Sequence, residues 1–186
     1  MGRNLVIFLT PSDNNKRLNR ICLEEWFWDI FIVDALIGNW DRHNGNWGFL
    51  YHYAADKLSL APIYDCGSCL FPQADEDIMQ RTLNDTSEKD LRVFSIPLSG
   101  IKIDGQKIRY FDFISSLQNT GCNRALKRIL PRINMSAIYY IIDETPFVTE
   151  LQRTFYKTIL KERKKRILDF SFQKLCRQEG EKEFEN

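Results

Sequence analysis

The apolar positions between residues 21 and 37 repeat every three or four residues, as Cys22, Trp26, Ile30, Val33 and Ile37. This spacing predicts a helix, and further apolar side chains widen its apolar stripe so far that we expect packing on most of its sides. Gly38 should end the helix in the left-handed conformation. Residues 1–20 begin with a strand-like run and continue as a polar loop, in which Ser12 or Asp13 would cap the helix.

Two apolar runs after this helix predict strands. They cover residues 47–53 and 58–64, and the linker 54–57 has the length of an ordinary hairpin loop. A second, smaller hairpin is expected over residues 101–108, with Asp104-Gly105 at its turn. The segment 71–92 is acid-rich and shows no clear periodicity, so we expect a long loop there, either solvated or facing a substrate.

From Tyr110 onward the pattern is helical. Two short amphipathic pieces and a third over residues 135–142 precede a long helix, for which Thr145 or Thr149 is the expected cap. The basic run 161–166 on that helix is interpreted as a solvated face with internal ion pairs, the alternative being an acidic or nucleic-acid partner.

These elements predict an α+β fold, mostly helical, with a small antiparallel β-hairpin. We expect a single domain over residues 1–178 and a charged flexible tail over residues 179–186.

Composition narrows the function classes. The 186 residues are 44% hydrophobic, with 13 Phe, 7 Tyr and 4 Trp, which indicates a folded globule. The balance of 26 basic and 25 acidic residues gives no electrostatic case for a nucleic-acid partner. No apolar run is long enough to span a bilayer, so no membrane association is expected. Five cysteines, an odd count, without a secretion signal predict a reduced, cytoplasmic protein.

Five polar side chains lie between the predicted helix and the first strand, namely Asp41, Arg42, His43, Asn44 and Asn46. Asp65 follows the second strand, and Gly67 comes two residues later. An Asp, an Asn five residues on and an Asp-x-Gly after a hairpin form the layout of a phosphoryl-transfer site. The hairpin would bring Asn46 and Asp65 together as oxygen ligands for Mg²⁺. The alternative is that these residues serve only as turn and cap residues.

The run Asp41-Arg-His-Asn-Gly-Asn46, together with Asp65-Cys-Gly67, resembles the catalytic and metal loops of HipA-like serine/threonine kinases. The same run resembles phosphoinositide 3/4-kinases, which share that fold superfamily. Asp34-Ala-Leu-Ile-Gly38 and Pro62-Ile-Tyr-Asp65 favour the bacterial HipA-like branch. The resemblance implies a kinase-like C-terminal lobe whose hairpin carries the site, with ATP and Mg²⁺ as cofactors and a protein hydroxyl as acceptor.

The resemblance also implies residue roles. Asp41 takes the position of the catalytic aspartate, while Asn46 and Asp65 take those that hold the metal and the bound nucleotide. His43 is a second candidate base, because phosphoinositide kinases place a functional histidine there. Its structural alternative is a bond to a backbone carbonyl. Arg42 is expected to be a scaffold residue that pairs with an acid of the loop.

Cys66-Gly-Ser-Cys69 raises two alternatives, a zinc site completed by His43 and His52, or a redox pair. The chain has no second CxxC to support zinc and lacks the thioredoxin-like surroundings that would support redox chemistry. We therefore favour neither.

The sequence departs from the resemblance upstream of Asp41. A kinase needs a nucleotide-covering loop and a phosphate-binding lysine there, but this stretch holds only Lys16, Gly2 and Gly38 as lysine and glycines. We therefore expect that the N-terminal lobe is lacking and that the chain is inactive without it. A separate N-terminal-lobe or antitoxin-like protein would be the partner. The alternatives are a non-catalytic binding or regulatory module, and a lipid or small-molecule kinase.

Overall fold

The computed structural model describes residues 5–7, 20–103 and 105–184. Its strands and helices follow one another as β1 (Leu5–Ile7), α1 (Arg20–Ile37), β2 (Phe49–His52), β3 (Lys57–Leu60), α2 (Glu76–Asn84), α3 (Thr86–Asp90), β4 (Leu98–Ile103), β5 (Gln106–Arg109), α4 (Tyr110–Ser116), α5 (Thr120–Ile129), α6 (Met135–Glu144), α7 (Glu150–Arg163) and α8 (Phe170–Phe184). Short π-helical segments occupy Leu91–Ser95 and Lys164–Asp169. The expected α+β fold with a helical majority is confirmed.

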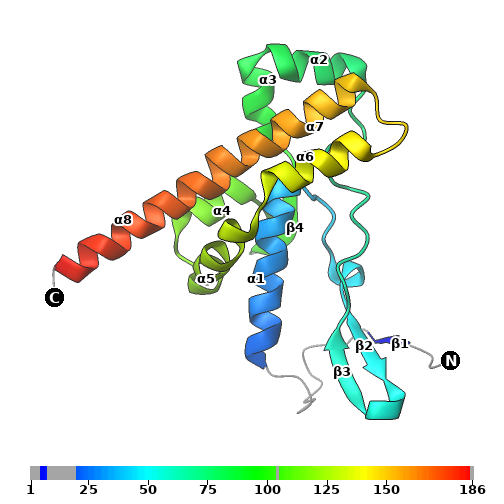
Figure 1. Ribbon diagram of the computed structural model, residues 1–186. Helices are drawn as coiled ribbons and strands as arrows, with labels where there is room; N and C mark the ends of the chain where they lie inside the picture. The colour runs from blue at the N-terminus through cyan, green and yellow to red at the C-terminus, as the bar shows by residue number, and fades with distance from the viewer. Residues whose placement is uncertain (1–4, 8–19, 104, 185–186) are drawn as a thin grey trace.

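Helix α1 stands at the centre of the helical part. It packs against α5 and α7, and α7 continues through the π-helical segment into α8 as one long rod (Figure 1). The side chains of Ile30, Phe31, Ile32, Ala35 and Leu36 are all buried. The C-terminal half of α1 is therefore held by its packing, and it gives the loop that follows a fixed starting point.

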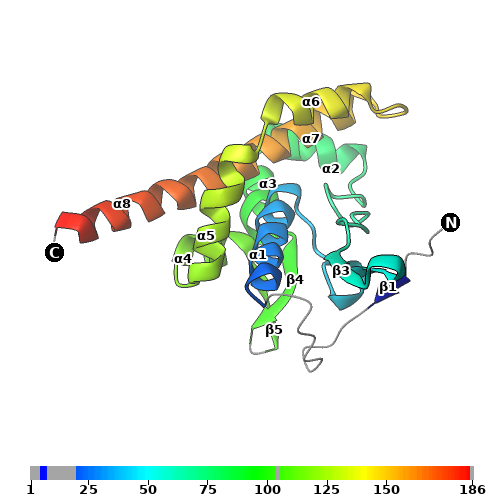
Figure 2. The same ribbon diagram turned by 60° about the horizontal axis from the view of Figure 1, so that its bottom comes forward.

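The predicted hairpin forms, with shorter strands than the pattern indicated. Strand β2 pairs antiparallel with β1 and β3, with Phe49 opposite Leu60. Tyr53–Ala55 turn as a 3₁₀ helix and Asp56 adopts the left-handed conformation, which ends the pairing at His52. This sheet projects from the helical part (Figure 1). The second predicted hairpin is β4–β5, which lies beside α1 (Figure 2).

The expectation of a loop over 71–92 is wrong, because α2 and α3 lie there. Two of its acids are helix caps: Asp75 accepts a hydrogen bond from the Ile78 amide (2.8 Å) and Asp85 from the Ser87 amide (2.7 Å). Helix α2 packs on α7 and buries Met79. An apolar stripe this short leaves little periodicity for a sequence pattern to reveal.

The interpretation of residues 161–166 as a solvated face is wrong at Arg163, which is fully buried. Its guanidinium donates to the carbonyls of Ala35 (2.8 Å), Arg92 (2.8 Å) and Val93 (3.0 Å), and burial lowers its pKa to about 10. These carbonyls belong to the last turn of α1 and to the π-helical segment after α3. The other part of that interpretation holds, since Arg166 pairs with Glu162 at 3.6 Å.

Helix α7 begins at Glu150, so Thr149 is the cap and Thr145 is not. The Thr149 hydroxyl accepts from the Gln152 amide (3.2 Å) while Gln152 accepts from the Thr149 amide (2.8 Å), a capping box. Helix α8 continues to Phe184, so the expected domain boundary after residue 178 falls inside a helix. Among the described residues, no helix has the length and apolar character needed to cross a bilayer. The caps expected at Ser12 or Asp13 lie outside the described residues.

Candidate functional site

The loop between α1 and β2 is fixed before it reaches Asp41. Gly38 ends α1 with φ of +68°, as predicted. The buried side chain of Asn39 donates to Asp34 (3.0 Å) and accepts from the Asp41 amide (3.1 Å). The Tyr110 hydroxyl donates to the Asn39 carbonyl at 2.5 Å. The backbone that carries Asp41 is therefore held by α1 and by the start of α4.

Arg42 turns inward and connects three parts of the chain. Its Nε and Nη2 donate to the two carboxylate oxygens of Asp34, and its Nη1 donates to the carbonyls of Asn46 (2.8 Å) and Tyr64 (2.9 Å). Burial by itself would lower the pKa of Arg42, but the contacts with Asp34 outweigh it and the pKa is raised. Arg42 thus has the scaffold role we expected, although its acid lies on α1 and not in the loop.

The shared Nη1 atom brings the two candidate metal-ligand segments together. The carbonyls of Asn46 and Tyr64 both accept a hydrogen bond from this nitrogen, so the two residues lie close together. Asp65 is the next residue after Tyr64. The Leu70 amide donates to the Ile37 carbonyl at 2.9 Å, which ties the segment after Asp65 to the end of α1.

Asn46 and Asp65 both offer oxygen atoms. The buried Asn46 donates through Nδ2 to the Asp41 carbonyl at 2.7 Å, which fixes the orientation of its carboxamide. Among the described residues, nothing donates a hydrogen bond to Asn46 Oδ1, and the exposed Asp65 carboxylate has no hydrogen-bond or ion-pair partner. An amide oxygen and a carboxylate are the ligands that a hard divalent cation prefers.

The geometry of His43 favours one tautomer. Its Nδ1 accepts a hydrogen bond from the Gly45 amide at 3.0 Å and so caps the 3₁₀ turn Asn44–Asn46. The proton of the neutral ring is then on Nε2, which lies 4.0 Å from Asp41 Oδ2. The structural alternative expected a bond to a backbone carbonyl; the partner is a backbone amide instead. The Asp41 side chain is 47% exposed, so its carboxylate is accessible.

Strand β4 lies directly on the backbone of this loop. A Cβ atom at Gly100 would come within 2.6 Å of the Arg42 carbonyl oxygen and 2.9 Å of its amide nitrogen. Nearby, Lys107 of β5 places its Nζ 6.0 Å from the centre of the Trp40 ring. Our sequence interpretation missed the close approach of Gly100 to Arg42, because it began the second hairpin at residue 101, whereas β4 begins at Leu98 and contains Gly100.

The Cys66–Cys69 pair does not form part of a metal cluster. Cys66 Sγ lies 3.6 Å from Arg42 Nη2, and burial together with the neighbouring Cys66 raises the pKa of the Cys69 thiol to about 12. His52 contacts Ser59, not a cysteine. Within the described residues, no three His, Cys, Asp or Glu side chains are placed to hold a metal ion, which argues against the zinc alternative. The candidate magnesium site, with one amide and one carboxylate, is not a group of this kind.

Comparison with known proteins identifies the fold of this site. No known protein-family model matches the chain. It is 46% identical over 167 residues to the serine/threonine-protein kinase CtkA of Helicobacter pylori. A crystal structure of the H. pylori proinflammatory kinase CtkA superposes with a TM-score of 0.85 at 43% identity. The chain is a homologue of CtkA and has a kinase-like fold.

The similarity to CtkA covers most of this chain and part of the relative. It extends over 89% of the chain and 51% of CtkA in sequence, and over 90% of the chain and 61% of the CtkA crystal chain in structure. The chain therefore spans about half the length of the curated relative that it matches.

Proposed function

We propose that this chain forms the catalytic-loop lobe of a HipA-like, ATP- and Mg²⁺-dependent serine/threonine protein kinase. The observation that carries the proposal is the arrangement of Asn46: its amide nitrogen is bound to the Asp41 carbonyl, its oxygen is left for a ligand, and Arg42 ties its backbone to Tyr64, the residue before Asp65. The homology to CtkA supports the same reaction class.

In this proposal Asp41 is the base that orients the acceptor hydroxyl and receives its proton. Its carboxylate is accessible, while the backbone on both sides is held by Asn39 and Asn46. Asn46 and Asp65 would hold Mg²⁺ on the nucleotide phosphates, where the ion neutralises charge that develops during phosphoryl transfer. Because Asp34 neutralises Arg42, the guanidinium adds little net positive charge beside the metal ligands.

The complete reaction also needs groups that cover the nucleotide and contact its phosphates. We propose that these groups come from another part of the polypeptide or from a partner protein. If the partner is antitoxin-like, assembly with it would control the kinase activity. Removing one such electrostatic contact commonly lowers the rate by about 10²-fold or more. The 186-residue chain should accordingly transfer phosphate slowly by itself.

Divalent-ion binding tests the proposal without requiring turnover. Isothermal titration of Mg²⁺ and Mn²⁺, with and without ATP, should show a site in the wild type that is lost in Asp65→Asn. Asp77→Asn serves as the matched control, since Asp77 is an exposed acid on α2. If Asp65→Asn binds the ions as well as the wild type does, Asp65 is not a ligand and the proposed site is wrong.

A further inference from the structure

Two cysteines that the proposed function does not use share one turn. The Cys69 amide donates to the Cys66 carbonyl at 3.1 Å, across Gly67 and Ser68. A hydrogen bond from the fourth residue back to the first marks a β-turn, which keeps the two outer Cα atoms within about 7 Å. A disulfide needs Cα atoms about 4.4–6.8 Å apart. The backbone of the turn therefore holds the two cysteines close enough for a disulfide.

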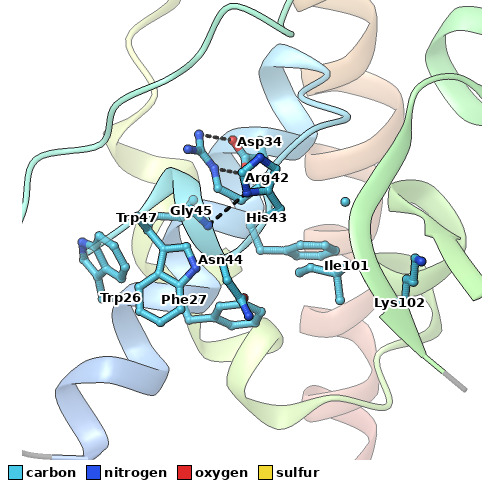
Figure 3. A pocket seen from close by; sticks show the side chains of 13 residues that line it. Trp26, Phe27, Asp34, Arg42, His43, Asn44, Gly45, Trp47, Ile101 and Lys102 are labelled. Carbon is cyan, nitrogen blue, oxygen red and sulfur yellow. Dashed lines mark hydrogen bonds and ion pairs between the residues drawn. The ribbon is translucent and has the colours of Figure 1, made fainter. Parts of the chain in front are cut away.

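The two thiols of this turn differ in exposure. Cys66 is exposed, so a reagent in solution can reach it, whereas Cys69 is half-buried. The Cys66 side chain lies close enough to contribute to the raised pKa of the Cys69 thiol. Arg42, which pairs with Asp34 in the wall of a cavity of about 560 Å³ (Figure 3), donates to Cys66 Sγ at 3.6 Å. Cys66 is therefore the thiol that a reagent reaches first, and Cys69 is its neighbour.

The turn lies in a segment whose ends are fixed and whose backbone is strained. The Tyr64 carbonyl is bound to Arg42, and the Leu70 amide donates to the Ile37 carbonyl. Asp65 and Leu70 have φ of +55° and +56°. Residues other than glycine adopt this left-handed conformation at a cost, because Cβ comes close to the following carbonyl oxygen. Opening of the segment would release this strain, so a covalent bond across the turn would make opening rarer.

A small-molecule disulfide is the chemical class of reagent that would close the turn. The Cys66 sulfur attacks one sulfur of the reagent and forms a mixed disulfide, and its proton leaves with the first reagent thiol. Cys69 then attacks the Cys66 sulfur, and its proton leaves with the second thiol. The two cysteines lose two electrons and two protons, and the reagent gains both. The raised pKa of Cys69 makes it a slow nucleophile, but this second step takes place inside one turn, where the effective concentration is high.

We propose that Cys66 and Cys69 form a reversible disulfide, a redox modification site that fastens the turn after Asp65. Such a bond needs only two neighbouring thiols, and not the surroundings of a thioredoxin-like motif. The odd cysteine count predicts a reduced protein, so the dithiol is the resting form and an oxidant closes it. The disulfide requires no metal at Asp65, so it goes beyond the proposed function.

The test equilibrates the reduced chain with glutathione buffers of increasing glutathione disulfide content, without ATP or divalent ions. After the remaining thiols are alkylated, peptide mass spectrometry without reduction locates the bonds. We expect an internal Cys66–Cys69 disulfide that dithiothreitol reverses.

Two variants control this test. Cys176→Ser removes an exposed cysteine on α8 and should keep the internal disulfide. Cys69→Ser should carry only a mixed disulfide with glutathione at Cys66. If the wild type also carries only that mixed disulfide, or no disulfide, the proposal is wrong.

Hydrogen exchange measures whether the bond fastens the segment. The amides of residues 67–71 should exchange about tenfold more slowly in the oxidised wild type than in the reduced form, because the closed ring removes open conformations. Cys69→Ser, treated with the same two buffers, should exchange alike in both. Equal rates in the oxidised and reduced wild type would show that the disulfide does not hold the segment, and would overturn the proposal.

Asp65→Asn separates this proposal from the proposed function. Asparagine tolerates the left-handed conformation of this position, so the variant should form the disulfide as the wild type does, although it should lose the metal site. A wild type that forms the disulfide but binds no Mg²⁺ would refute the metal site alone. A wild type that binds Mg²⁺ but forms no disulfide would refute the modification site alone.

Discussion

Arg42 and Asp34 form a buried ion pair with two parallel hydrogen bonds, Nε to Oδ2 at 2.9 Å and Nη2 to Oδ1 at 3.0 Å. The remaining guanidinium nitrogen binds the carbonyls of Asn46 and Tyr64. One side chain therefore joins α1, the candidate catalytic loop and the segment that follows β3. Arginine suits this position because its planar group makes several directed bonds at once, which lysine cannot do.

Asp34→Asn should strongly destabilise the fold. The substitution leaves the Arg42 charge buried without a partner, and breaking such a pair typically lowers the free energy of unfolding by about 3 kcal/mol or more. Urea denaturation followed by circular dichroism measures the change. Glu179→Gln removes the surface pair with Lys127 and should cost less than about 1 kcal/mol. Similar losses of unfolding free energy in the two variants would show that the buried Asp34–Arg42 pair stabilises the fold no more than a surface ion pair does.

Gly100→Ala should disturb the site without touching any candidate ligand. The added methyl group would meet three backbone atoms of Arg42, at 2.6, 2.9 and 3.0 Å, and these can move aside only if the loop or β4 shifts. We expect a lower melting temperature and weaker Mg²⁺ binding. Gly180→Ala is the control, because the new Cβ would meet no atom within 4 Å apart from its chain neighbours and the backbone of its own helix, and alanine is the better helix former. Wild-type Mg²⁺ affinity in Gly100→Ala would mean that β4 does not hold the loop in place.

The sequence allowed the central elements of this structure to be predicted, because their signals are local. The apolar repeat before Gly38 and the two strand runs after it each depend on neighbouring residues, and α1 and the β2–β3 hairpin follow. Long-range contacts could not be predicted in this way. The partner of Arg42 is eight residues away, and the carbonyls that bind Arg163 lie more than 60 residues from it in sequence.

In the segment 71–92, the sequence interpretation was wrong because it assigned helix-capping acids to a loop. Asp75 and Asp85 are typical of both loops and helix N-termini, and only the packing of α2 on α7 decides between them. The candidate site itself stays a prediction at Asp41, His43, Asn46 and Asp65. The structure adds their hydrogen bonds, which the spacing of the motif does not specify.

The contact between Asp90 and Arg166 should make a pH-dependent contribution to stability. The hydrogen bond from Arg166 (2.7 Å) lowers the pKa of the Asp90 carboxyl below its ordinary value. Because the pKa of Asp90 is lower in the folded state, its ion pair stabilises the fold at pH values above the unfolded-state pKa of about 3.9. This stabilisation is lost as the pH falls through the folded-state pKa. Asp90→Asn should thus melt slightly below the wild type at pH 7, and the difference should disappear near pH 2. A difference that persists in acid would assign the effect to packing and not to charge.

The last prediction separates the two candidate bases. The Nδ1 lone pair of His43 is occupied by the Gly45 amide, and its Nε2 carries the proton, so the neutral ring has no free lone pair to accept one from a substrate. The Asp41 carboxylate is accessible, and a carboxylate oxygen offers more than one lone pair. Asp41→Asn in the full-length protein should therefore lower kcat by about 10²-fold or more, with little change in stability because its backbone bonds remain.

Substitutions at His43 complete this test. Asparagine is a good capping residue, so His43→Asn should keep the bond from the Gly45 amide and most of kcat. His43→Gln, whose longer side chain fits the cap less well, should lose more, chiefly through loop stability seen as a lower melting temperature. Steady-state kinetics of Asp41→Asn, His43→Asn and His43→Gln, measured over a range of pH, shows which of the two residues is the base. If His43→Asn folds normally but abolishes turnover while Asp41→Asn retains it, the ring of His43 is the base. The mechanism would then resemble that of the phosphoinositide kinases, with Asp41 holding the ring in place across the 4.0 Å gap.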